Sequence, residues 1–399
     1  MLQRSNHQLV VTLVGCVAIY GSGNMLLQSP LSLGLPAGPL RTKKSSRLRP
    51  FEGFGSNPGN LRAWFWKPEA AATKRLPLVV VLHGCTQDAA GFDIGSGWSK
   101  LAKAHGFAVL FPEQQRLNNA NLCFNWFEPG DTRRDGGEAL SIAQMIGAMA
   151  DQHRIDRERI FITGLSAGGA MTSVMLATYP ELFTGGAILA GLPHGAAGSV
   201  QEAFQQMRAH SPTPRTTGRS IKRASHHSGR WPAVSIWHGT ADVVVSPSNA
   251  EAIVRQWKEV HGLSNASSTE GVVDGYPHRE WRDSEGRLLL EEYRVTGMGH
   301  GTPLDTRGEC GCGEAGAFML EAGISSTVHS ARTWGLLSSA KARSKARKRV
   351  RKPASTTAKS RSGPAKAIVP PAPTSRHSQL ETGIARVINS ALRAAGLMK

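Results

Sequence analysis

Short apolar runs alternate with amphipathic segments through the middle of the chain. The most apolar run, Leu-Val-Val-Val-Leu at 78–82, is typical of a strand that is buried on both faces. Further strands are predicted at 107–111, 159–163, 186–190, 232–237 and 288–295, and helices at 98–105, 137–151, 170–179 and 248–261. This alternation predicts an α/β fold with a mostly parallel central sheet and helices on both faces.

The most informative local motif is Gly164-Leu165-Ser166-Ala167-Gly168, which lies between the predicted strand 159–163 and the predicted helix 170–179. A G-x-S-x-G nucleophile elbow requires this strand–turn–helix context. The sharp turn exposes the serine hydroxyl above the sheet and opens the following helix with free N–H groups. Ser166 is therefore the candidate nucleophile, and the alternative is a glycine-rich turn that holds an incidental serine.

Candidate partners of this serine follow in the order acid, then histidine, that the fold requires. Asp242 lies in the turn after the predicted strand 232–237, and His300 lies between glycines after the strand 288–295. His300 is expected to act as general base and then acid, while Asp242 holds its tautomer and stabilises the imidazolium. Asp274 is the alternative acid, but it lies in a polar, glycine-containing loop with no clear strand before it.

An acyl-transfer site also needs backbone donors directed at the oxyanion. One is expected from the N–H of Ala167, directly after the candidate nucleophile. The second is expected after the apolar strand 78–82, where the chain reads His83-Gly84-Cys85, and the candidate donor is the N–H of Cys85. We expect His83 to pack and to form hydrogen bonds rather than to move protons.

Several segments together carry a family likeness: Val-Leu-His-Gly-Cys-Thr-Gln at 81–87, Cys-Phe-Asn-Trp-Phe at 123–127, Gly-Leu-Ser-Ala-Gly-Gly-Ala-Met at 164–171, Gly-Met-Gly-His-Gly at 297–301, and the segments 317–327 and 391–398. They resemble the poly(3-hydroxybutyrate) depolymerase family of esterases, which also contains feruloyl and acetyl-xylan-type carbohydrate esterases. The resemblance covers residues 55–337 and the last twenty. It implies an α/β-hydrolase fold, no metal and no organic cofactor.

Ser166, Asp242 and His300 fall on the family's triad positions, so the resemblance and the residue pattern agree. Trp126 and Gln87 lie within the shared motifs and are candidate substrate-binding residues. The chain departs from the family at 211–230, a polar, basic, insertion-like segment placed where a lid or substrate-binding segment would lie.

The positive charge is concentrated in the last part of the chain. Residues 338–399 hold 15 Lys and Arg and one acidic residue, so they carry +14 of the total net charge of +18. We expect a basic Pro/Ala/Ser-rich linker at 338–375 and an amphipathic helix at 376–399, after a catalytic domain at 51–337. The run 341–352 either contacts a polyanion, such as nucleic acid, polyphosphate or an anionic surface, or serves as a solvated linker.

Residues 1–50 are expected to form a leader and a basic lead-in. The uncharged run 9–20 has the length of a secretory h-region and is too short to span a membrane. Export to the periplasm or the outside of the cell is therefore expected, with lipid attachment at Cys16 as a further alternative. The remaining alternative is an irregular extension on a cytoplasmic protein.

The other four cysteines also bear on whether the protein is exported. Cys85 and Cys123 fall in the two loops expected to frame the active site, where a disulfide would clamp the oxyanion loop in an oxidising compartment. Cys310 and Cys312 are separated by one residue, a spacing that does not match a zinc knuckle. The sequence leaves open whether this second pair is reduced or bridged.

Two functional classes follow from these patterns. The first is a serine esterase that hydrolyses short-chain polyhydroxyalkanoate polymer or oligomers, with feruloyl or acetyl-xylan esters as the alternative substrates. The second is a polyanion- or granule-binding protein that works through its basic tail. The complete triad and both oxyanion loops favour the esterase.

Overall fold

The computed structural model describes residues 46–69, 75–208, 217–308 and 310–337. The predicted signal segment with Cys16, the basic linker 338–375 and the predicted helix 376–399 lie outside these residues. The described part contains the predicted catalytic domain apart from short internal gaps.

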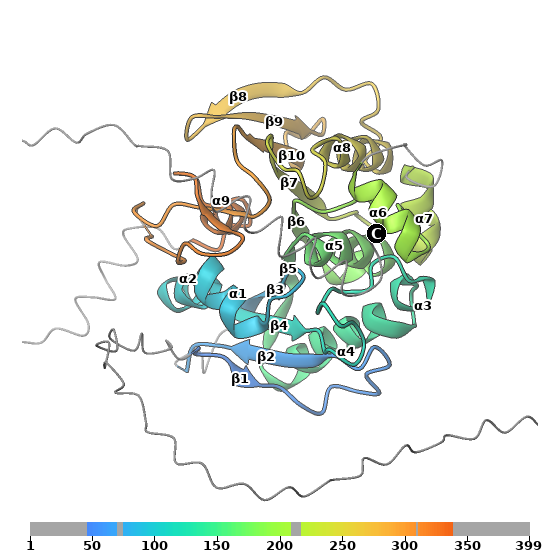
Figure 1. The fold of residues 1–399 in the computed structure, drawn as a ribbon, viewed down its shortest axis with the longest axis vertical. Helices are drawn as coiled ribbons and strands as arrows, with labels where there is room; N and C mark the ends of the chain where they lie inside the picture. Colours follow the sequence, from blue (N-terminus) through green and yellow to red (C-terminus); the bar gives the residue numbers. More distant parts are fainter. Residues whose placement is uncertain (1–45, 70–74, 209–216, 309, 338–399) are drawn as a thin grey trace, which may run out of the picture. The chain divides into compact units, whose positions relative to one another are not determined.

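A ten-stranded sheet forms the centre of the protein (Figure 1). Its order is β1-β2-β4-β3-β5-β6-β7-β10-β9-β8, and the six strands from β4 to β10 are mutually parallel. These six are β4 (Ala108–Glu113), β3 (Leu76–Leu82), β5 (Ile155–Leu165), β6 (Gly185–Leu189), β7 (Ala233–Gly239) and β10 (Leu288–Val295). All seven residues of β3 are buried, which explains its continuous apolar sequence.

Antiparallel strands extend the sheet at both edges. They are β1 (Arg49–Pro50) and β2 (Arg62–Trp66) on one side, and β8 (Thr269–Val273) and β9 (Tyr276–Arg282) on the other. The hydrophobic pattern did not predict these strands, because edge strands are short and partly exposed.

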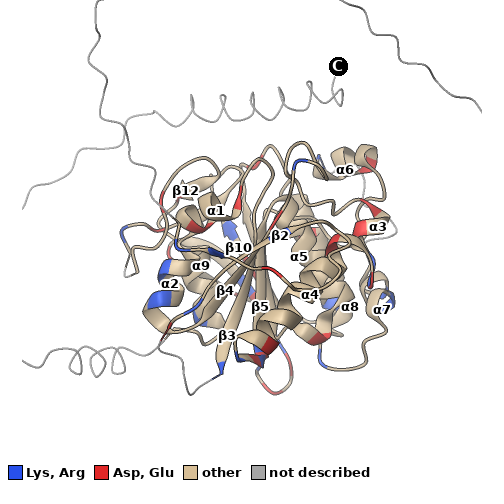
Figure 2. Cartoon of the chain, turned by 90° about the horizontal axis from the view of Figure 1, so that it is seen from below, with Lys and Arg blue, Asp and Glu red and all other residues tan. Residues whose placement is uncertain are grey.

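Helices cover both faces of the sheet, as Figures 1 and 2 both show. One face carries α1 (Ala89–Ser96), α2 (Trp98–His105) and α9 (Ser326–Thr333), and the other carries α4 (Gly137–Gln152), α5 (Ala167–Thr178) and α8 (Ser248–Val260). Successive residues of β3 alternate between the two cores: Val79 and Val81 join the first helix set, and Leu78 and Val80 the second. The predicted α/β architecture is confirmed.

The remaining elements are short: α3 (Pro129–Thr132), the 3₁₀ turn η1 (Pro180–Leu182), α6 (Val200–Met207), α7 (Gly218–Ser225), and the parallel pair β11 (Thr302–Leu304) and β12 (Met319–Glu321). Lys and Arg are interspersed with Asp and Glu over the drawn elements (Figure 2).

Two local expectations need correction. Asp274 does follow a strand, because β8 and β9 form a hairpin whose two-residue turn is Asp274-Gly275, with φ values of 47° and 86°. Within the predicted insertion 211–230, the described part from 217 onward forms α7, which packs against α8 through the buried Ile221 and the bond from Gly218 N–H to Glu259. It contributes no residue to the pocket described next.

Candidate active site

The turn from β5 into α5 presents Ser166 at the carboxyl end of the sheet. Ser166 has φ 58° and ψ −117°, a strained geometry for a non-glycine residue, and its N–H donates to Leu189 O at 2.9 Å. The neighbouring glycines permit this turn by close approach. A Cβ at Gly164 would overlap the carbonyl of Gly168, and a Cβ at Gly168 would overlap that of Leu82. The G-x-S-x-G motif therefore forms the elbow that its sequence context predicts.

His300 and Asp242 come from two neighbouring loops that are joined to each other. The loop after β7 and the loop after β10 share the bonds Ala241 N–H to Met298 O and Gly297 N–H to Thr240 Oγ1. They place Nδ1 of His300 2.7 Å from Oδ2 of Asp242. The structure thus pairs the predicted histidine with the predicted acid.

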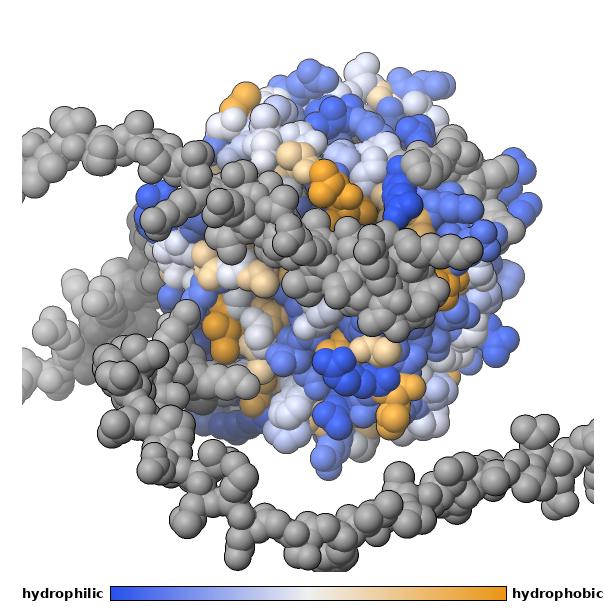
Figure 3. All heavy atoms as spheres, viewed as in Figure 1, coloured by the Kyte–Doolittle hydropathy of each residue, from blue (hydrophilic) through white to orange (hydrophobic). Residues whose placement is uncertain are grey.

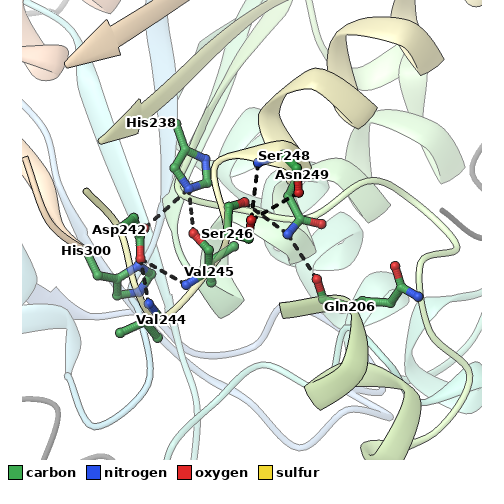
Figure 4. A network of polar contacts seen from close by, with 9 residues as sticks. All are labelled: Gln206, His238, Asp242, Val244, Val245, Ser246, Ser248, Asn249 and His300. Carbon is green, nitrogen blue, oxygen red and sulfur yellow. Dashed lines mark hydrogen bonds and ion pairs between the residues drawn. The ribbon is translucent and has the colours of Figure 1, made fainter. Parts of the chain in front are cut away.

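The Asp242 side chain is fully buried and held by several donors. Its Oδ1 accepts the N–H groups of Val244 and Val245, both at 2.9 Å, while Oδ2 faces the rings of His300 and His238 (Figure 4). Burial by itself would raise the pKa of this carboxyl. The charge of His300 and the hydrogen bonds from His238 and His300 outweigh burial and lower the pKa below its usual range. Asp242 therefore stays ionised beside His300.

The two candidate oxyanion donors lie on opposite sides of Ser166 in the sequence. Ala167 is the first residue of α5, where backbone N–H groups have no intrahelical partner. Cys85 lies in the loop after β3 and forms a disulfide with Cys123. Within the described ranges, neither backbone N–H donates to another residue. Both groups are thus available to an oxyanion near Ser166.

Gln87 holds the loop that carries Cys85. Its Oε1 accepts the Gly84 N–H at 2.9 Å, and its own backbone N–H donates to Gly84 O at 3.3 Å. His83, fully buried, braces the same loop from beneath: its Nε2 accepts the Gln114 N–H at 3.1 Å, which leaves Nδ1–H to donate to Gly84 O at 2.8 Å. Burial lowers the pKa of His83, in accord with the predicted packing role.

A pocket of about 170 Å³ brings these groups together. Ser166, His300, Cys85 and Ala167 all line it, as do the predicted substrate-binding residues Gln87 and Trp126. The remaining lining residues are Gly84, Thr86, Asn119, Asn121, Cys123, Phe127, Leu165, Leu192, Val200, Ala203, Phe204, Met207, Val244, Val245 and Phe318.

One wall of this pocket was not predicted from the sequence. It is made by α6, whose lining residues are spaced as i, i+3, i+4 and i+7, a helical periodicity readable from the sequence. The start of α6 was also readable, because Ser199 and Glu202 form an S-x-x-E capping signature and Ser199 Oγ accepts the Glu202 N–H. His238, the second ring on Asp242, carried no distinguishing signal among the 14 histidines.

Surface hydrophobicity does not offer a competing site on the face drawn in Figure 3, where apolar side chains form small patches among hydrophilic ones. The large apolar side chains that are exposed in the described part are Leu117, Val243 and Val272. Isolated exposed apolar residues of this kind are ordinary on a protein surface. No helix within these described residues is long and apolar enough to cross a bilayer.

A family model described as "Esterase PHB depolymerase" matches residues 61–275, which is more than half of the chain. The chain belongs to this esterase family. It is 44% identical over 290 residues to poly(3-hydroxyalkanoate) depolymerase C of Paucimonas lemoignei, covering 71% of this chain and 69% of that protein. It is also 32% identical to feruloyl esterase B of Neurospora crassa, covering 70% of this chain and 95% of the relative.

A solved structure supports the same assignment. Acetyl xylan esterase from Aspergillus awamori superposes with a TM-score of 0.58 at 27% sequence identity, over 63% of this chain and 93% of that one. The PHB depolymerase family relationship, together with the α/β-hydrolase fold, makes this protein a carboxylic ester hydrolase. The sequence-based predictions of family, fold and enzyme class are confirmed.

Proposed function

We propose that this protein hydrolyses short-chain poly(3-hydroxyalkanoate) polymer or its oligomers, with Ser166 as nucleophile, His300 as general base and acid, and Asp242 as the orienting carboxylate. The single observation that carries the proposal is the shared pocket. Ser166 and His300 both line it, and His300 is bonded on its other nitrogen to the buried Asp242. This is the arrangement of a nucleophile, a base and a third group that orients the base.

The reaction follows from the position of each group. His300 Nε2 removes the proton of the Ser166 hydroxyl as its oxygen attacks the ester carbonyl, and the N–H groups of Cys85 and Ala167 stabilise the oxyanion. His300 then protonates the leaving alcohol, and an acyl-enzyme ester remains on Ser166. Water, activated by His300, hydrolyses this ester, releasing the acid and restoring the serine. Asp242 stabilises the imidazolium in both steps.

The composition of the pocket supports a neutral aliphatic acyl group. Leu165, Leu192 and the α6 side chains make apolar walls, and the described lining includes no Asp, Glu, Lys or Arg. A hydroxyalkanoate ester unit is uncharged. Transfer of its alkyl branch from water to an apolar wall is favourable. The relative named poly(3-hydroxyalkanoate) depolymerase C, at 44% identity, supports the same substrate class.

A second candidate is hydrolysis of feruloyl or acetyl-xylan esters. Thr86, Gln87, Asn119 and Asn121 give part of the lining a polar character that suits sugar hydroxyls. Relatives named for feruloyl and acetylxylan esterase activity share about 31–32% identity with this chain. The apolar α6 wall favours the polyester over this alternative.

The test compares substrates on one purified preparation of the full chain. Clearing of a poly(3-hydroxybutyrate) suspension and release of acid from soluble hydroxybutyrate oligomers are measured beside methyl ferulate and acetylated xylan, with Ser166→Ala as the blank. Faster turnover of the hydroxybutyrate substrates supports the proposal. Faster turnover of ferulate or acetyl esters selects the second candidate, and activity that survives in Ser166→Ala rejects Ser166 as the nucleophile.

We also propose that the protein is exported to the periplasm or the cell exterior. The described residues contain two disulfides, Cys85–Cys123 and Cys310–Cys312, and disulfides persist in oxidising compartments. The predicted signal segment and Cys16 lie outside the described residues. Fractionation of cells expressing the full chain, followed by N-terminal sequencing of the mature protein, tests export and the cleavage site together.

A further inference from the structure

One carboxylate oxygen of Asp242 is shared by two histidine rings (Figure 4). Nδ1 of His300 lies 2.7 Å from Oδ2, and Nε2 of His238 lies 3.3 Å from the same atom. Nε2 of His238 also lies 2.9 Å from the carbonyl oxygen of Val245. Because both neighbours of this nitrogen are acceptors, Nε2 of His238 carries a hydrogen, which it donates to Val245 O and shares with Oδ2 of Asp242.

The sheet fixes His238 at this point. It is the penultimate residue of β7, opposite Arg294 of the parallel strand β10, and four residues before Asp242. Its side chain is 2% exposed, so bulk water does not compete with Asp242 for the ring N–H. The strand end and the following tight turn therefore place a buried donor beside the acid.

Charged groups besides Asp242 also lie near His238. Glu292 and Arg294 on β10 and Glu251 on α8 share a cavity of about 200 Å³ with the ring, and Arg279 on β9 binds both Glu292 and Glu251. Nδ1 of His238 is buried and has no hydrogen-bond partner within the part of the chain that the structure describes. The ring of His238 therefore borders both Asp242 and this ion-pair cluster.

The four contacts of Asp242 divide into two groups. Oδ1 is fixed by the backbone N–H groups of Val244 and Val245, whereas the partners of Oδ2 within the described residues are the two histidine rings. During catalysis His300 transfers protons through its other ring nitrogen, Nε2, while its Nδ1–H remains on Oδ2. His238 is the second donor on Oδ2, and it takes no part in proton transfer.

We propose that His238 is a positioning residue for ester hydrolysis, and that its Nε2–H holds Oδ2 of Asp242 in line with Nδ1–H of His300. This role rests on the proposed function of the Ser166 site. The bond also withdraws negative charge from the carboxylate, which weakens the attraction of Asp242 for a protonated His300. His238 thus sets both the orientation of the general base and the charge that Asp242 presents to it.

The decisive variants are His238→Leu and His238→Gln in the full chain, assayed on 4-nitrophenyl butyrate across a pH series. In His238→Leu, kcat falls about 10- to 100-fold with KM nearly unchanged, as is typical when an outer partner that orients an active group is removed. The acid limb of the kcat/KM profile moves to higher pH, because the stronger carboxylate charge stabilises the imidazolium. His238→Gln, whose amide nitrogen can replace the Nε2 donor, restores most of kcat and moves the limb back.

A matched control comes from a second histidine–aspartate pair. His329 is also largely buried, and its Nε2 lies 2.7 Å from Asp274, but neither residue lines the active-site pocket. His329→Leu is expected to keep the wild-type kcat and pH profile. Thermal unfolding of every variant checks that the fold is retained. The kcat values of His238→Gln and His238→Leu are then compared on folded protein.

The outcomes separate the two proposals. A folded His238→Leu with the wild-type kcat and acid limb overturns the positioning role, and so does His238→Gln that is as slow as His238→Leu. An equal loss and shift in His329→Leu overturns it as well, since the effect would then not be specific to Asp242. A wild-type protein that hydrolyses no ester overturns the proposed function, and with it the role of His238.

Discussion

Asp274 is paired with His329: its Oδ2 lies 2.7 Å from the ring nitrogen Nε2, at the turn of the β8–β9 hairpin. The other candidate acid, Asp242, lies at the same distance from Nδ1 of His300, which lines the pocket together with Ser166. The two candidate acids therefore belong to different sites. Asp274 pairs with His329 outside the pocket, and Asp242 pairs with the histidine that lines it.

The first prediction concerns these two acids. Asp242→Ala is expected to lower kcat/KM by about 10⁴-fold, since the loss of a triad carboxylate has effects of that order. Asp274→Ala is expected to leave kcat/KM within a factor of about three of the wild type, because substitutions at exposed turns away from the active site have small effects. Steady-state hydrolysis of a soluble butyrate ester measures both, and a larger loss in Asp274→Ala would reverse the assignment.

The second prediction concerns the nucleophile and the base. Ser166→Ala and His300→Ala are each expected to reduce turnover by about 10⁶-fold, and the double variant by no more than either alone, because the two groups act as a unit. Thermal unfolding should change little in Ser166→Ala, since replacing a strained positive-φ serine removes only a hydroxyl. A double variant much slower than both single variants would show that the two residues act independently.

The third prediction concerns the Cys85–Cys123 disulfide, which joins the loop of one oxyanion donor to the loop of Trp126. Replacing both cysteines by serine is expected to lower the free energy of unfolding by about 2–4 kcal/mol and to reduce kcat. Cys310→Ser with Cys312→Ser is the control, because neither residue lines the pocket. Free, alkylatable Cys85 and Cys123 thiols in natively exported protein, found by mass spectrometry, would contradict the bridge.

The fourth prediction concerns Glu138, a buried residue of α4. Its Oε1 accepts from Gln114 at 2.5 Å and its Oε2 from the Asn125 N–H at 2.9 Å, so it braces the loop that carries Cys123 and Trp126. Burial, followed by the charge of Asp131, raises the pKa of Glu138 to about 8 from its usual value near 4.5, although both hydrogen bonds act in the opposite direction.

The sign of the pH effect follows from this direction. Between these two pKa values the folded protein retains a proton that the unfolded chain has released, so the free energy of unfolding falls as pH rises. The stabilisation by Glu138 is complete below about pH 4.5 and is lost as the pH rises through about 8. Relative to Glu138→Gln, the wild type should lose up to about 4 kcal/mol between about pH 5 and about pH 8 in urea titrations. Parallel pH dependences in the two proteins would contradict the raised pKa.

The fifth prediction concerns the basic run 341–352, which lies outside the described residues and remains a sequence-based hypothesis. Replacing its Lys and Arg residues by Gln is expected to abolish retention on heparin, while turnover of a soluble ester stays unchanged. Binding of the wild type should weaken steeply with salt, because counterions are released when anionic groups are neutralised. Wild-type protein that binds no polyanion at about 50 mM salt would leave this run as a solvated linker.

Local sequence determined the strands of the parallel core and the elbow. The run 78–82 is predictable from its own residues, because burial on both faces of the sheet selects a continuous apolar run. The glycines around Ser166 are equally informative, because the sharp turn requires small side chains. The order of Ser166, Asp242 and His300 was likewise readable, since it reflects the order of strands that carry them.

Tertiary structure alone decided how distant loops meet. The placement of α6 in the pocket wall and the pairing of Asp274 with His329 depend on contacts between segments that are distant in the sequence. His238 shows the reason most clearly. Its position at the end of β7 was readable, but its bond to Asp242 results from the path of the turn that follows, and its burial results from packing against β10 and α8. Sequence spacing specifies which residues share a strand or helix face, whereas the directions of side chains across loops are set by the packed chain as a whole.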